Sequence, residues 1–92
     1  MRLGAAGGDG HVQARCDLRG LRLDAAERAL EKALDQCLSE GLATLWVVHG
    51  HGTGVLRQGV RELLEMSPYV AAMRPADAQE GGDGVTVVTL RH

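Results

Sequence analysis

Two segments of the chain have the apolar spacing of an amphipathic helix. From Asp24 to Gly41, apolar residues recur three and four positions apart, and charged residues fill the other side. Asp24 is predicted to cap this helix, with Glu27 three residues later completing a capping box, and Gly41 is predicted to end it. A second helix is predicted from about Val55 to Met66, where a Ser-Pro pair ends it.

Four segments have the pattern of β-strands. Thr44–Val48 is a continuous apolar run, which is typical of a strand that is buried on both faces. His11–Asp17 alternates loosely, Tyr69–Arg74 is short, and Val85–Leu90 has high β-propensity. The polar, glycine-rich segment between the last two strands is predicted to be a mobile loop.

The element order β-α-β-α-β-β predicts an α/β fold with a four-stranded mixed sheet and two helices. Right-handed crossovers make the first two strands parallel. Helices on both faces of the sheet would explain the unbroken apolar run at residues 45–48. A two-layer sandwich, with both helices on one face, is the alternative.

The chain length of 92 residues indicates one domain, which we place at residues 11–92. Residues 1–10 contain four glycines and two alanines and are predicted to be a flexible linker. The domain has no Phe, one Trp and one Tyr, so its core must be aliphatic.

Charge and cysteine content narrow the class of protein. The formal net charge is −2, so a surface for nucleic acid must be a local patch. Two cysteines do not form a disulfide framework, and the chain has neither a signal peptide nor an apolar run of membrane-spanning length. A cytoplasmic location without membrane contact is expected.

Two turns are predicted to meet at one edge of the sheet, because the carboxyl ends of parallel strands lie together. The first is Asp17-Leu18-Arg19-Gly20, and the second runs from His49 to Gly54. The second turn leads into a helix N-terminus, where free N–H groups and the helix dipole attract anions. We interpret the expected anion as a nucleic-acid phosphate.

The second turn has three glycines in alternation, Gly50, Gly52 and Gly54, which allow positive φ and close approach of a ligand. Thr53 is placed to cap the following helix or to donate its hydroxyl. The turn lacks the Gly-Lys-Ser/Thr of a phosphate-binding P-loop and the spacing of a dinucleotide site. No tightly bound cofactor is therefore expected.

His49 and His51 add titratable groups to this turn. General acid or base chemistry suits an imidazole, since it titrates near neutral pH. A metal held by both histidines and Asp17 is conceivable, but the ligand spacing does not indicate a tight zinc site. In the simplest alternative, one histidine orients the loop through a backbone hydrogen bond and the other is exposed.

Arginines are expected to surround the crevice between the two turns. The nearest along the chain are Arg19 and Arg22 after the first strand, and Arg57 and Arg61 in the second helix. We expect Arg22 and Arg61 to be ordinary solvated surface residues.

Taken together, these motifs resemble the small MutS-related (Smr) domain. Asp17-Leu18-Arg19-Gly20 is similar to the Leu-Asp-Leu-Arg-Gly motif of that family, and residues 49–54 are similar to its His-Gly-x-Gly-x-Gly motif. Residues 81–88 resemble its glycine-rich approach to the last strand. The resemblance covers roughly His11 to Leu90 and is strongest to the branch found in bacterial MutS paralogues that suppress recombination.

The resemblance implies a βαβαββ two-layer sandwich, similar to the C-terminal domain of a bacterial translation initiation factor. It also implies a nicking endonuclease that cleaves DNA phosphodiester bonds, as part of a DNA recombination, repair or ribosome-rescue protein. Expected partners are DNA or RNA, the ribosome, and an attached ATPase domain. The alternative is a non-catalytic module that binds DNA, RNA or the ribosome.

The resemblance implies catalytic roles for three residues. His49 would be the base or acid, Arg19 would bind the scissile phosphate, and Asp17 would orient His49 or hold a divalent ion such as Mg²⁺ or Mn²⁺. The predicted nucleic-acid-binding residues are Gly50, His51, Gly52, Thr53, Gly54 and Arg57.

Two residues depart from the family pattern. Cys16 stands in place of a leucine, which affects packing more than chemistry. His51 stands where the resembling branch commonly has Lys or Arg, so a permanent charge is missing and phosphate affinity should depend on pH.

Overall fold

We analysed a computed structural model of the chain, which describes residues 3–6, 13–52 and 54–91. The sheet contains five strands, and two helices pack against it. The strands are β1 (Leu3–Ala6), β2 (Gln13–Asp17), β3 (Thr44–Val48), β4 (Val70–Pro75) and β5 (Val85–Leu90), and the helices are α1 (Leu23–Glu40) and α2 (Val55–Met66).

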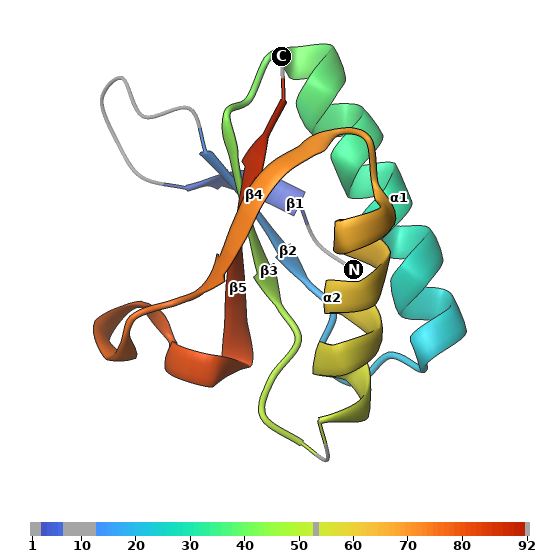
Figure 1. Cartoon of the computed structure of the whole chain (residues 1–92), viewed down its shortest axis with the longest axis vertical. Helices are drawn as coiled ribbons and strands as arrows, with labels where there is room; N and C mark the ends of the chain where they lie inside the picture. Colours follow the sequence, from blue (N-terminus) through green and yellow to red (C-terminus); the bar gives the residue numbers. More distant parts are fainter. Residues whose placement is uncertain (1–2, 7–12, 53, 92) are drawn as a thin grey trace.

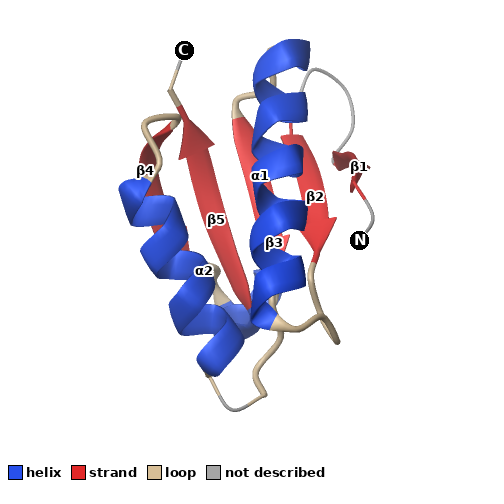
Figure 2. Ribbon diagram, turned by 90° about the vertical axis from the view of Figure 1, so that its right-hand side faces the viewer, coloured by secondary structure: helices blue, strands red, loops and turns tan. Residues whose placement is uncertain are grey.

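The strand order is β1-β2-β3-β5-β4. β2 and β3 are parallel, whereas β5 runs antiparallel to both β3 and β4. Figure 2 shows α1 and α2 side by side on the same face of the sheet. The four predicted strands of the mixed sheet and the two helices are therefore confirmed as a two-layer sandwich, to which β1 adds a fifth strand, and the prediction of helices on both faces is wrong.

The apolar run in β3 has a different explanation. Leu45 and Val47 face the helices and belong to the main core. Trp46 and Val48 face the other way and pack against Val85, Val87 and Ala76. The segment between β4 and β5 lies on that second face (Figure 1), so an irregular segment supplies the cover that a third layer of helices would have given.

The segment between β4 and β5 is more ordered than a simple loop. It contains two short 3-10 helices, η1 (Ala78–Glu80) and η2 (Gly82–Gly84). A capping box joins Asp77 and Glu80 at the first of them. The polar composition of this segment therefore reflects local capping and turn bonds, and it does not make the segment featureless.

The N-cap of α1 lies two residues earlier than the sequence indicated. It is Arg22, whose side chain makes no capping hydrogen bond, and Asp24 lies within the first turn. The predicted capping box of Asp24 and Glu27 is therefore wrong. Asp24 still stabilises the helix, because a negative charge in the first turn interacts favourably with the helix dipole. Gly41 ends α1 in the left-handed conformation, as predicted.

The N-terminal segment differs from the flexible linker predicted for residues 1–10. Leu3–Ala6 forms β1, which pairs antiparallel with β2 from Leu3–Cys16 to Ala6–Gln13. Residues 1–2 and 7–12 lie outside the described part of the chain. The chain thus adds an edge strand to the expected fold.

β4 forms the opposite edge of the sheet, and its pairing with β5 is irregular. The register shifts between Val70 and Ala72, so one residue of β4 bulges out of the ladder.

Among the described residues, no helix combines the length and apolar character that a membrane crossing requires.

Candidate functional site

The two turns predicted to meet at the sheet edge do meet. The Leu18 amide donates a hydrogen bond of 2.7 Å to the Val48 carbonyl, which extends the β2–β3 ladder into both turns. Gly50 has φ +79°, and a Cβ at this position would lie 3.3 Å from Cγ of Arg19. Glycine is needed here for both reasons, because it permits this backbone conformation and lets the Arg19 side chain pass close to the second turn.

A third turn joins the same edge. The amides of His49 and Gly50 both donate to the carbonyl of Gly84, at 3.1 and 3.0 Å. A Cβ on Gly84 would lie 3.0 Å from Nε2 of His51, so this imidazole rests on the glycine. The end of η2 therefore forms part of the site, although the sequence-based reasoning assigned it no function.

Asp17 and Arg19 form the first pair of interacting side chains at the candidate site. Nε of Arg19 donates to both carboxylate oxygens of Asp17, at 3.0 and 3.2 Å, and Nη2 donates to Oδ2 at 2.7 Å. These hydrogen bonds hold the pKa of Asp17 down at about 2, well below its ordinary value. The contacts use Nε and Nη2 of a side chain that is 63% exposed, so Nη1 takes no part in holding Asp17.

His49 is buried, with only 4% of its surface exposed. Its Nδ1 lies 2.9 Å from the carbonyl of Gly50, and its Nε2 lies 2.9 Å from the hydroxyl of Thr86. A carbonyl only accepts, so Nδ1 carries the proton, and Nε2 of the neutral ring accepts from Thr86. Both ring nitrogens are thus occupied by the protein itself.

Burial lowers the pKa of His49, and the nearby charges of Arg61 and Arg57 lower it further. The ring is therefore neutral at physiological pH. The Asp17 carboxylate is bound by Arg19, and the His49 ring is bound by Gly50 and Thr86. The predicted orienting contact from Asp17 to His49 is therefore not among the contacts of either side chain.

His51 has the opposite environment, because its side chain is exposed at the rim of the site. The pair thus matches the simplest alternative from the sequence, in which one histidine orients the loop and the other faces solvent. Gly50 contributes through its backbone shape, since its amide is already bonded to Gly84. Gly52 is exposed beside His51, and Thr53 lies outside the described residues.

The start of α2 forms the remaining side of the site. Its N-cap is Gly54, which has φ +86° and no side-chain cap, and its first turn contains no acidic residue. Arg57 lies in that turn, and its Nη1 is 4.0 Å from Oδ2 of Asp83. This arrangement leaves the positive end of the helix dipole without a negative side chain on its own helix, as an anion site requires.

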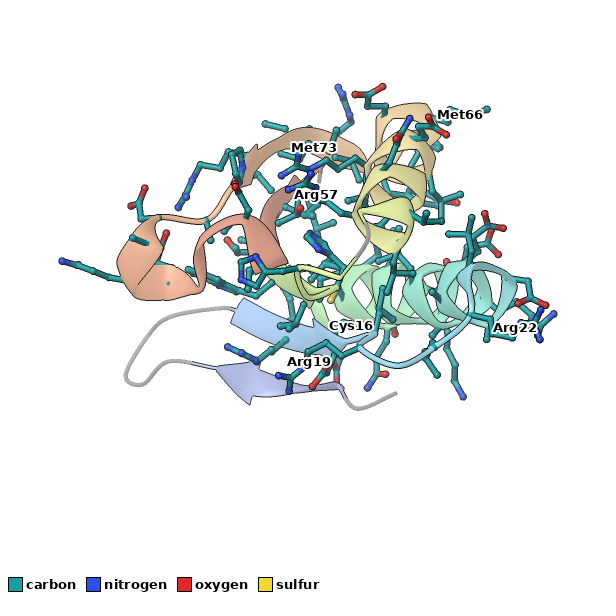
Figure 3. All side chains as sticks on the ribbon, turned by 90° about the horizontal axis from the view of Figure 1, so that it is seen from below. Cys16, Arg19, Arg22, Arg57, Met66 and Met73 are labelled. Atoms are coloured by element: carbon teal, nitrogen blue, oxygen red, sulfur yellow. The ribbon has the colours of Figure 1, made fainter. Side chains whose placement is uncertain are left out.

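Arg22 and Arg61 were both expected to be surface residues, and only Arg22 is one. Figure 3 shows Arg22 extending outward from the start of α1 and away from Arg19. Arg61 is half-buried, and its Nε donates to the Thr86 hydroxyl at 3.4 Å. Its Nη2 is buried without a hydrogen-bond partner among the described residues. Through its contact with Thr86, Arg61 thus helps to hold the hydrogen-bonded pair of Thr86 and His49 in place.

Three residues of this region were not assigned to the site by the sequence: Asp83, Gly84 and Thr86. Their only signal was the glycine-rich approach to the last strand, and its position became clear only when β5 was found beside β3. Within the described part of the chain, no group of three His, Cys, Asp or Glu side chains is arranged to hold a metal ion.

The buried state of His49 has a consequence for stability. Because its pKa is lowered on folding, the unfolded chain binds a proton more readily below the ordinary value of 6.5. The melting temperature should therefore fall as the pH drops from about 7.5 to about 5.5. The variant His49→Gln should show a smaller fall, as measured by circular dichroism at both pH values. An identical pH dependence in the variant would contradict this account.

Fold and site together define a small two-layer α/β domain with one glycine-rich edge flanked by arginines. The Smr domain family model matches residues 16–91, and the chain belongs to this family.

Known relatives agree with this assignment. The chain is 50% identical over 80 residues to Endonuclease MutS2 of Anaeromyxobacter sp. (strain Fw109-5), an alignment that covers 87% of this chain and 10% of the relative. It is 52% identical over 75 residues to Endonuclease MutS2 of Synechocystis sp., covering 82% of this chain and 9% of the relative. The chain therefore spans about a tenth of the length of these relatives.

Solved structures show the same architecture. The Smr domain of Thermus thermophilus MutS2 superposes with a TM-score of 0.84 at 45% identity, covering 85% of this chain and 98% of that one. YdaL, a stand-alone small MutS-related protein from Escherichia coli, gives a TM-score of 0.80 at 24% identity, covering 85% and 64%. The second likeness concerns the fold alone.

Proposed function

We propose that this domain binds a nucleic-acid backbone at one edge of the sheet and nicks it by hydrolysing a phosphodiester bond, with DNA as the substrate. The three turns, at residues 17–20, 49–54 and 82–84, meet at this edge, which we call the three-turn edge. The observation that carries the proposal is the packing of Arg19 across Gly50, in the turn that leads into α2. The guanidinium of Arg19, which can bind a phosphate through two donors, thus borders the same edge of the sheet as Arg57 and the N-terminus of α2. The family relatives named as endonucleases support the same chemistry.

The roles of the side chains follow from their exposure. Arg19 and Arg57 bind the non-bridging oxygens of the scissile phosphate and stabilise the extra negative charge of the transition state. Asp17 fixes the orientation of Arg19 through their paired hydrogen bonds. His49 keeps the turn in shape, since both of its ring nitrogens are already used.

We assign proton transfer to His51, because it is the exposed imidazole of the turn. A water oxygen attacks the phosphorus atom and the bond to one sugar oxygen breaks. The water proton passes to the imidazole, and the departing sugar oxygen takes up a proton from a solvent water molecule. The sequence-based prediction instead made His49 the base or acid, and that assignment stays a prediction.

The contacts at the same site predict whether nicking needs a metal ion. The positive charge is supplied by arginines, and Arg19 occupies both oxygens of Asp17. We therefore expect nicking to continue in EDTA and to change by less than about threefold when Mg²⁺ or Mn²⁺ is added. Loss of all activity in EDTA, with recovery in Mg²⁺, would show that Asp17 acts as a metal ligand instead.

The decisive assay measures the conversion of supercoiled plasmid to its open circular form, beside an RNA substrate. Wild type should nick the plasmid, and Arg57→Gln should nick it about fivefold more slowly, because the variant loses one exposed phosphate contact. Asp77→Asn is a matched control, since it also changes one charge but lies in the segment after β4. If all preparations nick equally, a contaminating nuclease is responsible.

A binding module without catalysis is the second candidate. It is favoured by the internal engagement of both Asp17 and His49, which leaves His51 as the exposed titratable group of the second turn. In that case binding weakens steeply with salt, and both DNA and RNA stay intact. Nicking by wild type that disappears in the Arg19 variant described below would exclude this candidate. Attachment to an ATPase domain and a role on ribosomes are further proposals for this chain.

A further inference from the structure

A second candidate site lies at the other end of the helical layer. A hollow of about 330 Å³ opens between α1 and the end of α2. Its walls carry apolar side chains from α2 and the following turn, and two carboxylates from α1. The lining residues are Glu31, Leu34, Asp35, Leu63, Met66, Ser67, Pro68 and Tyr69, and we call this surface the α1–α2 groove.

The groove exposes large apolar side chains. Met66 is 83% exposed and Tyr69 is 45% exposed, and both border the hollow. Figure 3 shows Met66 projecting from α2 into solvent. Methionine adapts its shape to different partners, and tyrosine is enriched in protein interfaces. These residues fit a surface that is covered by another polypeptide.

The placement of charged side chains around the groove lowers the stability of the isolated domain. Glu31 and Asp35 lie four residues apart on α1, where like charges repel each other. Glu62 and Glu65 lie in the second half of α2, where the negative end of the helix dipole disfavours them. Neither Glu31 nor Asp35 takes part in an ion pair among the described residues.

α2 therefore has opposite charges at its two ends. Arg57 lies in its first half and Arg61 lies just past its middle, whereas Glu62 and Glu65 follow in its second half, and this order is the reverse of the one that a helix dipole favours. Its twelve residues place the groove about 18 Å from the start of the helix. Carboxylates at the groove repel phosphates, so a nucleic acid at the three-turn edge would not extend onto it.

We propose that the α1–α2 groove binds a basic, apolar segment of a partner protein, with a large apolar side chain in the hollow and a Lys or Arg beside Glu31 and Asp35. Charge complementarity selects this occupant, because a cation relieves the repulsion between the two carboxylates. The cations of the described residues do not fill this role. Arg28 and Lys32 lie on α1 three residues before Glu31 and Asp35, but neither lines the groove and neither forms an ion pair with these carboxylates. Arg91 donates from Nη2 to the carbonyl of Val70 and does not line the groove.

The test uses a labelled amphipathic peptide of about fourteen residues, with leucines on one face and a lysine one turn from each leucine. A second peptide has glutamate in place of every lysine. The 92-residue chain should bind the lysine peptide and not the glutamate peptide. In isotope-labelled protein, the amide signals that move should be those of residues 31–35 and 63–69.

Variants of the chain assign the binding to the groove. Asp35→Lys should weaken lysine-peptide binding about tenfold, since it replaces an attraction by a repulsion. Glu40→Lys changes the net charge equally but lies at the end of α1 away from the hollow, and it should stay within about twofold. Met66→Ala should weaken binding several-fold without lowering the melting temperature, because this side chain is exposed.

Three outcomes of the peptide experiments would overturn the proposal. The first is equal binding of the two peptides, and the second is equal weakening by Asp35→Lys and Glu40→Lys. The third is movement of the signals of residues 49–57 instead of those of the groove. A concentration-dependent dimer of the chain that is lost in Met66→Ala would assign the groove to a second copy, and would also overturn the partner named above.

Discussion

Replacing Arg19 by methionine should lower the rate of plasmid nicking about a hundredfold or more, because it removes a donor aimed at the developing phosphate charge. The methionine retains most of the aliphatic contact with Gly50, so the turns should stay together. Asp17 loses the guanidinium but keeps the hydrogen bond from the backbone amide of residue 19, so its pKa rises from about 2 toward its ordinary value of 3.8. The carboxylate still stays ionised at neutral pH, so the loss of rate reports on the guanidinium.

Arg19→Lys is the matched variant for this experiment. It keeps the positive charge but cannot hold Asp17 through two donors in one plane while contacting a phosphate. We expect an intermediate rate, about tenfold below wild type. Melting curves of all three proteins should agree within a few degrees. A methionine variant that nicks at the wild-type rate would remove Arg19 from the mechanism.

The second large effect concerns stability and distinguishes two histidines that lie two residues apart. His49→Ala should destabilise the fold by about 3 kcal/mol, since it leaves a void and strips a partner from the buried Thr86 hydroxyl. In a domain of this size, the melting temperature should drop by on the order of 15 °C. Denaturant unfolding of wild type and variant gives the free energy directly.

His51→Ala is the control, because this side chain is exposed. Its stability should stay within about 0.5 kcal/mol of wild type. Its nicking rate should nevertheless fall about a hundredfold, as expected on loss of a general acid or base. The opposite result, in which His51→Ala unfolds the protein and His49→Ala stays folded but inactive, would restore the catalytic role to His49.

The local pattern of the sequence predicted the regular elements well. β3, α2 and β5 have the predicted boundaries, because a continuous apolar run, an amphipathic stripe and a run of valines each have one dominant solution. The start of α1 was predicted less well, since Asp24 favours both the cap and the first turn. The edge strand β1 was missed because its pairing with β2 leaves no periodic signal in Leu3–Ala6.

The sequence predicted only part of the site, and there is a physical reason for this. Asp17, Arg19 and the second turn follow parallel neighbouring strands, so chain order alone brings them together. Thr86 and Arg61 come near His49 only through the insertion of β5 between β3 and β4, which local patterns do not specify. Alternation of histidine and glycine in a turn likewise does not tell which imidazole is buried.

The irregular pairing of β4 has a consequence for how the domain behaves at high concentration. A free sheet edge with a regular row of N–H and C=O groups is a template for strands of other molecules. Here the register shift at Val70–Ala72 disturbs one end of the row, and Pro75 offers no amide hydrogen at the other. The β4 edge is therefore a poor starting point for aggregation, and strands of other copies should not add to this side of the sheet even when many copies are held close together.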